Sequence, residues 1–192
     1  MVKRSYLLLL LLGLLFVFTA CSSSDQPKNK IAAFTFTNEQ SEPFGSTDLQ
    51  DSIWIANFIF TSCDTVCPQM TAEMIRLQAK MKEAGLDVTF ISFTVDPEVD
   101  TPKIMKDYMA EFDQDEENWH MLTGYSQTEI ETFARDQFQT IVQKPATSNQ
   151  VIHGTNFYLI DRDGYLINEY NYNEAAYMEQ VVTDVKKLSE YK

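Results

Sequence analysis

One segment of the chain limits its possible folds more than any other. Residues 53–60 read Ile-Trp-Ile-Ala-Asn-Phe-Ile-Phe, an almost continuously apolar run. A strand with one face in water would alternate apolar and polar residues, so this run predicts a central strand that is covered on both faces. Residues 87–95 form a second strongly apolar strand with several β-branched side chains.

Helix signals follow these two strands. Four apolar side chains between residues 70 and 81 recur at helical spacing, and Gly85 predicts the end of that helix. Asp100-Thr101-Pro102 predicts an N-cap and a first-turn proline for a helix that runs to Phe112. Ser126 and Glu129 have capping-box spacing, which predicts a helix over residues 126–138. The other expected elements are an opening hairpin at 34–45, a strand at 119–122, a hairpin at 157–167 and a closing helix at 177–188.

The order of these elements indicates the fold class. Parallel strands joined by crossover helices, followed by an antiparallel hairpin and a last helix, are typical of a thioredoxin-like fold. We therefore predict an α/β protein with a central mixed β-sheet flanked by helices and an N-terminal β-hairpin extension. No repeat and no second linker interrupts residues 31–192, so we expect one domain there.

The first thirty residues have a different character. Lys3 and Arg4 precede an apolar run over residues 6–18, which is shorter than the roughly 20 residues that a membrane-spanning helix needs. We interpret residues 1–20 as a signal peptide. The sequence Phe18-Thr19-Ala20-Cys21 resembles a bacterial lipobox, so Cys21 is the expected site of lipid attachment, and residues 21–30 are the expected flexible tether. These features predict a protein anchored by lipid to the extracytoplasmic face of the cell membrane.

The charge balance excludes one class of partner. The chain holds 15 basic and 28 acidic residues, a net charge of −13. Residues 1–20 contain two basic and no acidic side chains, so removing them leaves 13 basic and 28 acidic residues, a net charge of −15. Nucleic-acid binders collect Lys and Arg on one face, so this composition argues against a nucleic-acid partner.

Two of the three cysteines form the motif Cys63-Asp64-Thr65-Val66-Cys67, followed at once by Pro68. Three cysteines are too few for a disulfide-rich scaffold. We expect Pro68 to be the first helical residue and Cys67 to lie at the helix N-terminus, where the exposed amides favour ionisation of both thiols. Such a pair can form a redox-active disulfide, a purely structural disulfide or part of a metal site.

The segment expected to face the cysteines carries a histidine. Thioredoxin-type oxidoreductases place a cis-proline just before the next antiparallel strand, but here residues 149–156 contain His153 and no proline. Two thiolates and one imidazole would offer a metal three protein ligands and one open position. The spacing does not separate zinc from copper, although an open dithiol site outside the cytosol makes copper delivery a coherent purpose. We interpret His120, inside a predicted strand, as structural.

Four blocks of the sequence resemble the Sco/SenC family, the copper-binding assembly factors of cytochrome c oxidase. They are residues 60–68 (Phe-Thr-Ser-Cys-Asp-Thr-Val-Cys-Pro), residues 95–102, residues 119–124, and His153 with residues 157–164. The blocks run in the family's order and span roughly residues 30 to 190. The resemblance implies a thioredoxin fold, one copper ion bound by Cys63, Cys67 and His153, and a role in building the CuA centre of oxidase subunit II. It also implies that the two cysteines can act as a redox pair that reduces the copper-site cysteines of that subunit.

The leading hypothesis is thus a copper metallochaperone whose partner is cytochrome c oxidase subunit II, and which we expect to act as a monomer. A thiol–disulfide reductase and a redox sensor remain as alternatives. We expect Asp96, at the carboxyl end of its strand, to support a ligand without binding the metal. Asp100 is interpreted as a helix cap or first-turn acid. The methionines at positions 70, 74 and 81 are interpreted as core rather than as copper ligands.

Overall fold

The structure is a computed structural model that describes residues 29–112 and 117–190. The predicted signal peptide at 1–20, the lipidation site Cys21 and the tether up to residue 28 lie outside the described residues. Within the described ranges, no helix is both long enough and apolar enough to cross a bilayer.

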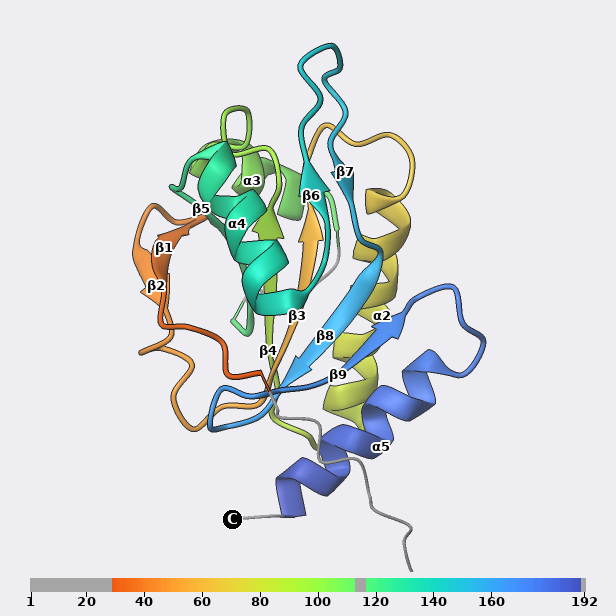
Figure 1. The fold of residues 1–192 in the computed structure, drawn as a ribbon. Helices are drawn as coiled ribbons and strands as arrows, with labels where there is room; N and C mark the ends of the chain where they lie inside the picture. The colour runs from red at the N-terminus through yellow and green to blue at the C-terminus, as the bar shows by residue number, and fades with distance from the viewer. Residues whose placement is uncertain (1–28, 113–116, 191–192) are drawn as a thin grey trace, which may run out of the picture.

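The centre of the protein is a mixed β-sheet of seven strands in the order β2-β1-β5-β4-β3-β8-β9 (Figure 1). The two apolar runs found in the sequence are its middle strands, β3 and β4, which pair in parallel. Every residue of β3 is buried, as expected for a strand covered on both faces. β4 also pairs in parallel with β5, whereas β1/β2, β1/β5, β3/β8 and β8/β9 are antiparallel. The strands are β1 (Thr35–Asn38), β2 (Pro43–Gly45), β3 (Trp54–Ile59), β4 (Thr89–Thr94), β5 (Trp119–Thr123), β8 (Asn156–Ile160) and β9 (Leu166–Asn171).

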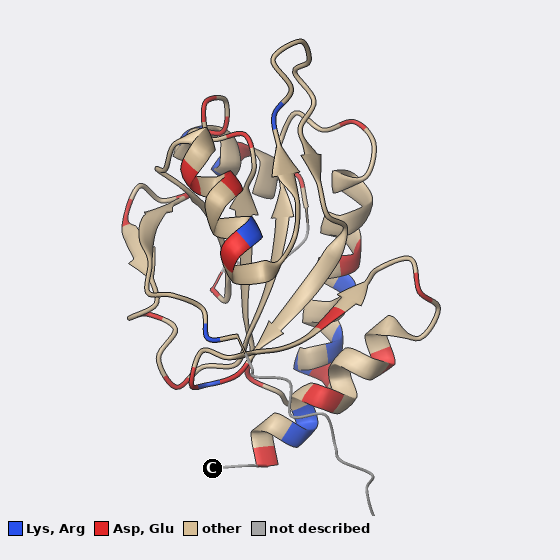
Figure 2. Cartoon of the chain, in the orientation of Figure 1, with Lys and Arg blue, Asp and Glu red and all other residues tan. Residues whose placement is uncertain are grey.

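The described helices are α2 (Cys67–Glu83), α3 (Pro102–Met109), α4 (Gln127–Phe138) and α5 (Tyr177–Glu190). α2 connects β3 to β4, and α3 connects β4 to β5, so both connections move along the sheet in the same direction. Because such connections are right-handed, both helices lie on the same face of the sheet. A hydrogen bond of 2.8 Å between Thr71 and Tyr108 joins them there. α4 lies on the opposite face, in front of β4 in Figure 1. Acidic residues are spread over loops and helices rather than gathered on one element (Figure 2).

The core beneath α4 is largely aromatic. Phe138, the last residue of α4, is 1% exposed. Its ring lies 5.1 Å from the rings of Phe58 on β3 and Tyr158 on β8, and 5.8 Å from that of Phe93 on β4. This one side chain therefore joins α4 to three neighbouring strands. On α2, the three methionines interpreted as core are buried, which confirms that interpretation: Met70, Met74 and Met81. Leu77, on the same helical face, is buried with them.

The structure corrects two local predictions and adds one element that was not predicted. The cap of α3 is Thr101, whose side chain accepts a hydrogen bond from the Ile104 amide, and not Asp100. α3 ends at Met109 because the next turns tighten: the Glu111 amide bonds to the Tyr108 carbonyl and the Phe112 amide to the Met109 carbonyl. A small hairpin of β6 (Val142–Gln143) and β7 (Ile152–His153), which the sequence did not predict, stands apart from the main sheet.

The packing of Phe138 predicts a large loss of stability when its ring is removed. We expect Phe138→Ala to lower the free energy of unfolding by about 3–5 kcal/mol, because it leaves a cavity among the strands that the ring joins. Urea unfolding of the full chain, followed by circular dichroism, measures this change. The control is Ile141→Ala, an exposed position three residues after Phe138, which should change stability by less than about 0.5 kcal/mol. Equal losses in the two variants would contradict this account of the core.

Candidate metal centre

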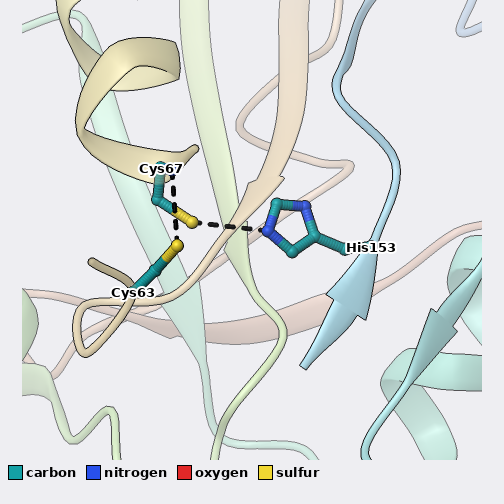
Figure 3. A group of neighbouring side chains, drawn as sticks. All are labelled: Cys63, Cys67 and His153. Atoms are coloured by element: carbon teal, nitrogen blue, oxygen red, sulfur yellow. Dashed lines mark hydrogen bonds between the residues drawn. The ribbon is translucent and has the colours of Figure 1, made fainter. Parts of the chain in front are cut away.

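Three side chains from separate elements meet at one end of the sheet. Cys63 lies in the turn after β3, Cys67 is the first residue of α2, and His153 is the last residue of β7. Their Sγ and imidazole nitrogen atoms all lie within 4.8 Å of one another. Figure 3 shows the imidazole of His153 pointing toward the sulfur atoms of Cys63 and Cys67. The structure thus brings together the three residues that the sequence singled out.

The turn between β3 and α2 directs both sulfurs to the same point. The backbone N–H of Cys67 donates to Cys63 Sγ over 3.4 Å, so the first amide of the helix faces the other cysteine. Val66 occupies the N-cap position, with no hydrogen bond from its side chain. Cys67 rather than Pro68 is therefore the first helical residue, one position earlier than expected.

The two thiols differ in acidity. Burial raises the pKa of Cys63, but hydrogen bonds from Cys67 and Thr65 outweigh burial, and the net shift is downward. Burial raises the pKa of Cys67, and the neighbouring Cys63 and Asp100 raise it further. The expectation that both thiols ionise readily is correct for Cys63 and wrong for Cys67. The helix N-terminus acts on both sulfurs, but Cys67 is completely buried and the cost of desolvation dominates.

His153 is held as a neutral imidazole whose ring orientation is fixed by the backbone. Its Nδ1 lies 2.8 Å from the carbonyl oxygen of Gly154, which can only accept, so Nδ1 carries the proton. The lone pair of Nε2 is then directed at Cys67 Sγ, 3.3 Å away. Burial lowers the pKa of His153, which favours the neutral imidazole. A hydrogen bond of this kind fixes the tautomer and the ring orientation that metal binding requires.

Asp100 supports the cysteine turn instead of capping a helix. Its buried carboxylate accepts hydrogen bonds from the Thr61 amide at 3.1 Å, from the Thr61 hydroxyl at 2.5 Å and from the Thr94 hydroxyl. Burial raises the pKa of this carboxyl group. The loop between β4 and α3 is therefore tied to the residues just before Cys63.

Asp96 lies in the same loop and is 1% exposed. Its Oδ1 lies 2.8 Å from Lys144 Nζ, which also lies 2.8 Å from Glu98 Oε2. The side-chain partner of Asp96 is thus a lysine beside β6 and not one of the three clustered residues. Sequence reasoning missed Lys144, because nothing in its flanking residues distinguishes it from a surface lysine.

His120 lies outside the cluster. Its Nδ1 is 3.4 Å from Glu39 Oε1, and its ring lies 4.4 Å from that of Phe44 in the N-terminal hairpin. These contacts join β5 to the N-terminal hairpin, which confirms the structural interpretation of this histidine.

The sequence matches the family model described as SCO1/SenC over residues 22–190. Among curated proteins, the chain is 42% identical over 184 residues to the SCO1 protein homolog of Bacillus subtilis. That match covers 94% of this chain and 95% of the relative.

Three solved structures have a similar fold. A SCO1/SenC family lipoprotein from Bacillus anthracis has a TM-score of 0.81 and 45% identity, covering 86% of this chain and 98% of the other. BsSco, described as a member of the Sco family of cytochrome c oxidase assembly proteins, has a TM-score of 0.79 and 43% identity, covering 86% and 96%. Arabidopsis thaliana ScoI with copper bound has a TM-score of 0.70 and 26% identity, covering 83% and 98%.

The fold and the sequence lead to the same relatives. The observed mixed sheet with flanking helices, together with these structural neighbours, confirms the predicted thioredoxin-like fold. The family model covers most of the chain, and the resemblance seen in the sequence blocks is confirmed. The chain belongs to the SCO1/SenC family.

Proposed function

We propose that this protein is a copper metallochaperone that binds one copper ion through Cys63, Cys67 and His153 and passes it to subunit II of cytochrome c oxidase for the CuA centre. The observation that carries the proposal is the group of two sulfurs and one imidazole nitrogen within 4.8 Å. Further support comes from two relatives, one described as an oxidase assembly protein and the other solved with copper bound.

The geometry of the three ligand atoms fits a single metal ion. Metal–sulfur bonds of about 2.3 Å and metal–nitrogen bonds of about 2.0–2.1 Å keep the ligands of one ion within about 4.6 Å of each other. The observed spacing needs only a small closing movement to reach that range. Thiolate ligands favour reduced copper, and among divalent metals an N/S site binds copper more tightly than zinc.

The cluster also suits a metal that must leave again. Three protein ligands leave one position for a ligand from the partner, either a thiolate or an imidazole. His153 is part-exposed and Cys63 is 7% exposed, whereas Cys67 is completely buried. Ligand exchange therefore begins on the side of His153 and Cys63, and Cys67 is the last ligand to release the ion.

The proposal predicts a specific loss on removing the imidazole. In the full chain, purified in detergent and reduced, His153→Ala should weaken Cu(II) binding by more than the roughly 10- to 100-fold that follows loss of an outer partner of a ligand. Its thiolate-to-copper absorption and EPR spectrum should also change, because one nitrogen leaves the coordination sphere. His120→Ala is the matched control and should bind copper like the parent. If His153→Ala and the parent share one spectrum and one affinity, His153 is not a ligand.

A second candidate function, a thiol–disulfide reductase, is favoured by the unequal acidity of the cysteines. The Cys63 thiolate would attack a disulfide in the partner, forming a mixed disulfide and releasing one partner thiolate. Cys67 would then lose its proton and displace the second partner thiolate. The pair ends as a Cys63–Cys67 disulfide, two electrons having passed to the partner, and a cellular thiol reductant must restore it. A redox sensor would use the same chemistry.

Deletion of the protein separates delivery from reduction. At low copper supply, cells without it should contain cytochrome c oxidase with less copper in subunit II. Added copper should restore that content if the protein delivers metal, because excess metal bypasses the carrier. A membrane-permeant dithiol, and not copper, should restore it if the protein acts as a reductase. Unchanged oxidase copper content in the deletion strain at low copper would exclude both roles.

We also propose that the mature protein begins at a lipid-modified Cys21 and is held at the extracytoplasmic face of the cell membrane. The support is the basic start, the short apolar run and the lipobox-like sequence, together with a Bacillus anthracis relative that is described as a lipoprotein. Residues 21–30 then form the tether between the lipid and the domain.

This anchor is testable with a single atom change. Cys21→Ser replaces the sulfur that would carry the lipid, so the protein should move from the membrane fraction to the soluble extracytoplasmic fraction. Ser22→Ala, one residue on, is the control and should stay with the membrane. Fractionation followed by immunoblotting gives the distribution. A Cys21→Ser protein that remains in the membrane fraction at the parent's apparent mass would exclude lipidation at this site.

A further inference from the structure

The hairpin that carries His153 has little stability of its own. β6 and β7 form a separate two-stranded sheet with only two residue pairs, Val142 with His153 and Gln143 with Ile152. A hairpin of this size is not independently stable in water. The position of the imidazole therefore depends on whatever holds the hairpin against the rest of the domain.

Lys144, the residue directly after β6, makes three polar contacts to other elements. Its backbone N–H donates to Glu131 Oε1 on α4 over 3.0 Å. Its ammonium group lies 2.8 Å from both Asp96 Oδ1 and Glu98 Oε2 in the loop that follows β4. Lys144 is the only Lys or Arg in residues 142–153, and Figure 2 shows a single basic stretch on this hairpin. These contacts connect the hairpin to two other parts of the protein.

The contact between Lys144 and Asp96 differs from the surface ion pairs of this protein. The side chains of Lys144 and Asp96 are 20% and 1% exposed. Those of Lys103 and Asp107, a pair along α3, are 83% and 63% exposed. Surface pairs of that kind are screened by water and hold little in place, whereas an enclosed pair resists separation because parting it leaves a buried charge without a partner. The two carboxylates also raise the pKa of Lys144, which keeps its ammonium group charged.

The same loop supports the other half of the cluster. The Asp100 amide donates to the Asp96 carbonyl over 2.9 Å, which closes the loop into a tight turn. The Asp100 carboxylate then holds Thr61, two residues before Cys63. One end of the turn is thus joined to the cysteines and the other end, through Lys144, to the hairpin of His153.

We infer that Lys144 is a positioning residue for His153: by joining the β6–β7 hairpin to the Asp96 turn, it holds the imidazole opposite the two cysteine sulfurs. Lys144 itself does not touch the metal. The inference deepens the proposed copper-binding function and rests on it, since it concerns the placement of one proposed ligand.

A double-mutant cycle in the full chain tests this inference with Cu(II) as the probe. Lys144→Met removes the ammonium group, keeps most of the apolar stem, and should weaken Cu(II) binding roughly 10- to 100-fold, as loss of an outer partner of a ligand does. The thiolate-to-copper absorption and the EPR spectrum should shift toward those of His153→Ala. In the His153→Ala background, Lys144→Met should cause no further loss. Equal losses in both backgrounds, or no loss in either, would overturn the inference.

Two further variants keep the result interpretable. Lys80→Met, which removes one partner of an exposed pair with Glu83, should bind copper like the parent. Lys144→Met combined with Asp96→Asn leaves no unpaired buried carboxylate, so it should fold even if Lys144→Met alone does not. It should show the same weakened copper binding, and parental affinity in this double variant would overturn the inference.

A measurement without metal separates this inference from the proposed function. In the metal-free protein, Lys144→Met should speed hydrogen exchange at the hydrogen-bonded amides of β6 and β7 relative to Lys80→Met, because the hairpin opens more often. If the parent binds no copper, the proposed function fails, and the exchange rates still decide whether Lys144 holds the hairpin. Unchanged exchange in Lys144→Met would refute that role of Lys144 whatever the copper result.

Discussion

The geometry of the site depends on the hydrogen bonds that the buried carboxylate of Asp100 accepts. A charged group in this position needs hydrogen-bond donors from every direction, and it takes them from the Thr61 amide, the Thr61 hydroxyl and the Thr94 hydroxyl. Thr94 ends β4 and Thr61 begins the cysteine turn, so one side chain fixes the end of a central strand relative to the sulfurs. The parallel pairing of β3 and β4 brings these groups within reach of each other.

Unequal burial makes the two cysteines chemically different although they belong to one short motif. The sulfur of Cys63 accepts a hydrogen bond from the first amide of α2, and the pKa of Cys63 is lowered. Cys67 is completely buried, and its pKa is raised. Cys63 is thus the first to offer a thiolate, either to a metal or to a disulfide. A metal that binds both sulfurs has to displace the proton of Cys67, because only the deprotonated sulfur is a ligand. The same asymmetry serves metal exchange and thiol exchange, which is why both proposed chemistries fit one site.

The sequence was sufficient for the parts of the protein that local patterns determine. The apolar run at 53–60, the capping box at Ser126 and the spacing of Cys63 and Cys67 predicted the central strand, helix α4 and the cysteine turn. It was not sufficient where the outcome depends on burial. Whether Asp100 caps a helix or satisfies a buried turn, and whether Cys67 ionises, depend on what covers each side chain in the folded protein. Lys144 and the β6–β7 hairpin were missed for the same reason, since two-residue strands leave no periodic signal.

The two halves of the site differ in how extensively they are packed into the domain, and this difference fits the proposed transfer of a copper ion. The cysteine turn sits between β3, whose residues are all buried, and α2, whose inner face packs in the apolar core. The histidine sits on a hairpin of two residue pairs outside the main sheet, held by buried Val142 and Val151, by the Phe60 ring 5.8 Å from the imidazole, and by the polar contacts of Lys144. A hairpin of two residue pairs opens at a lower free-energy cost than strands that are paired along their whole length inside a packed core. In the proposed copper transfer, an approaching partner would therefore move His153 away while the two sulfurs stay in place, which would make the imidazole the first ligand to be exchanged.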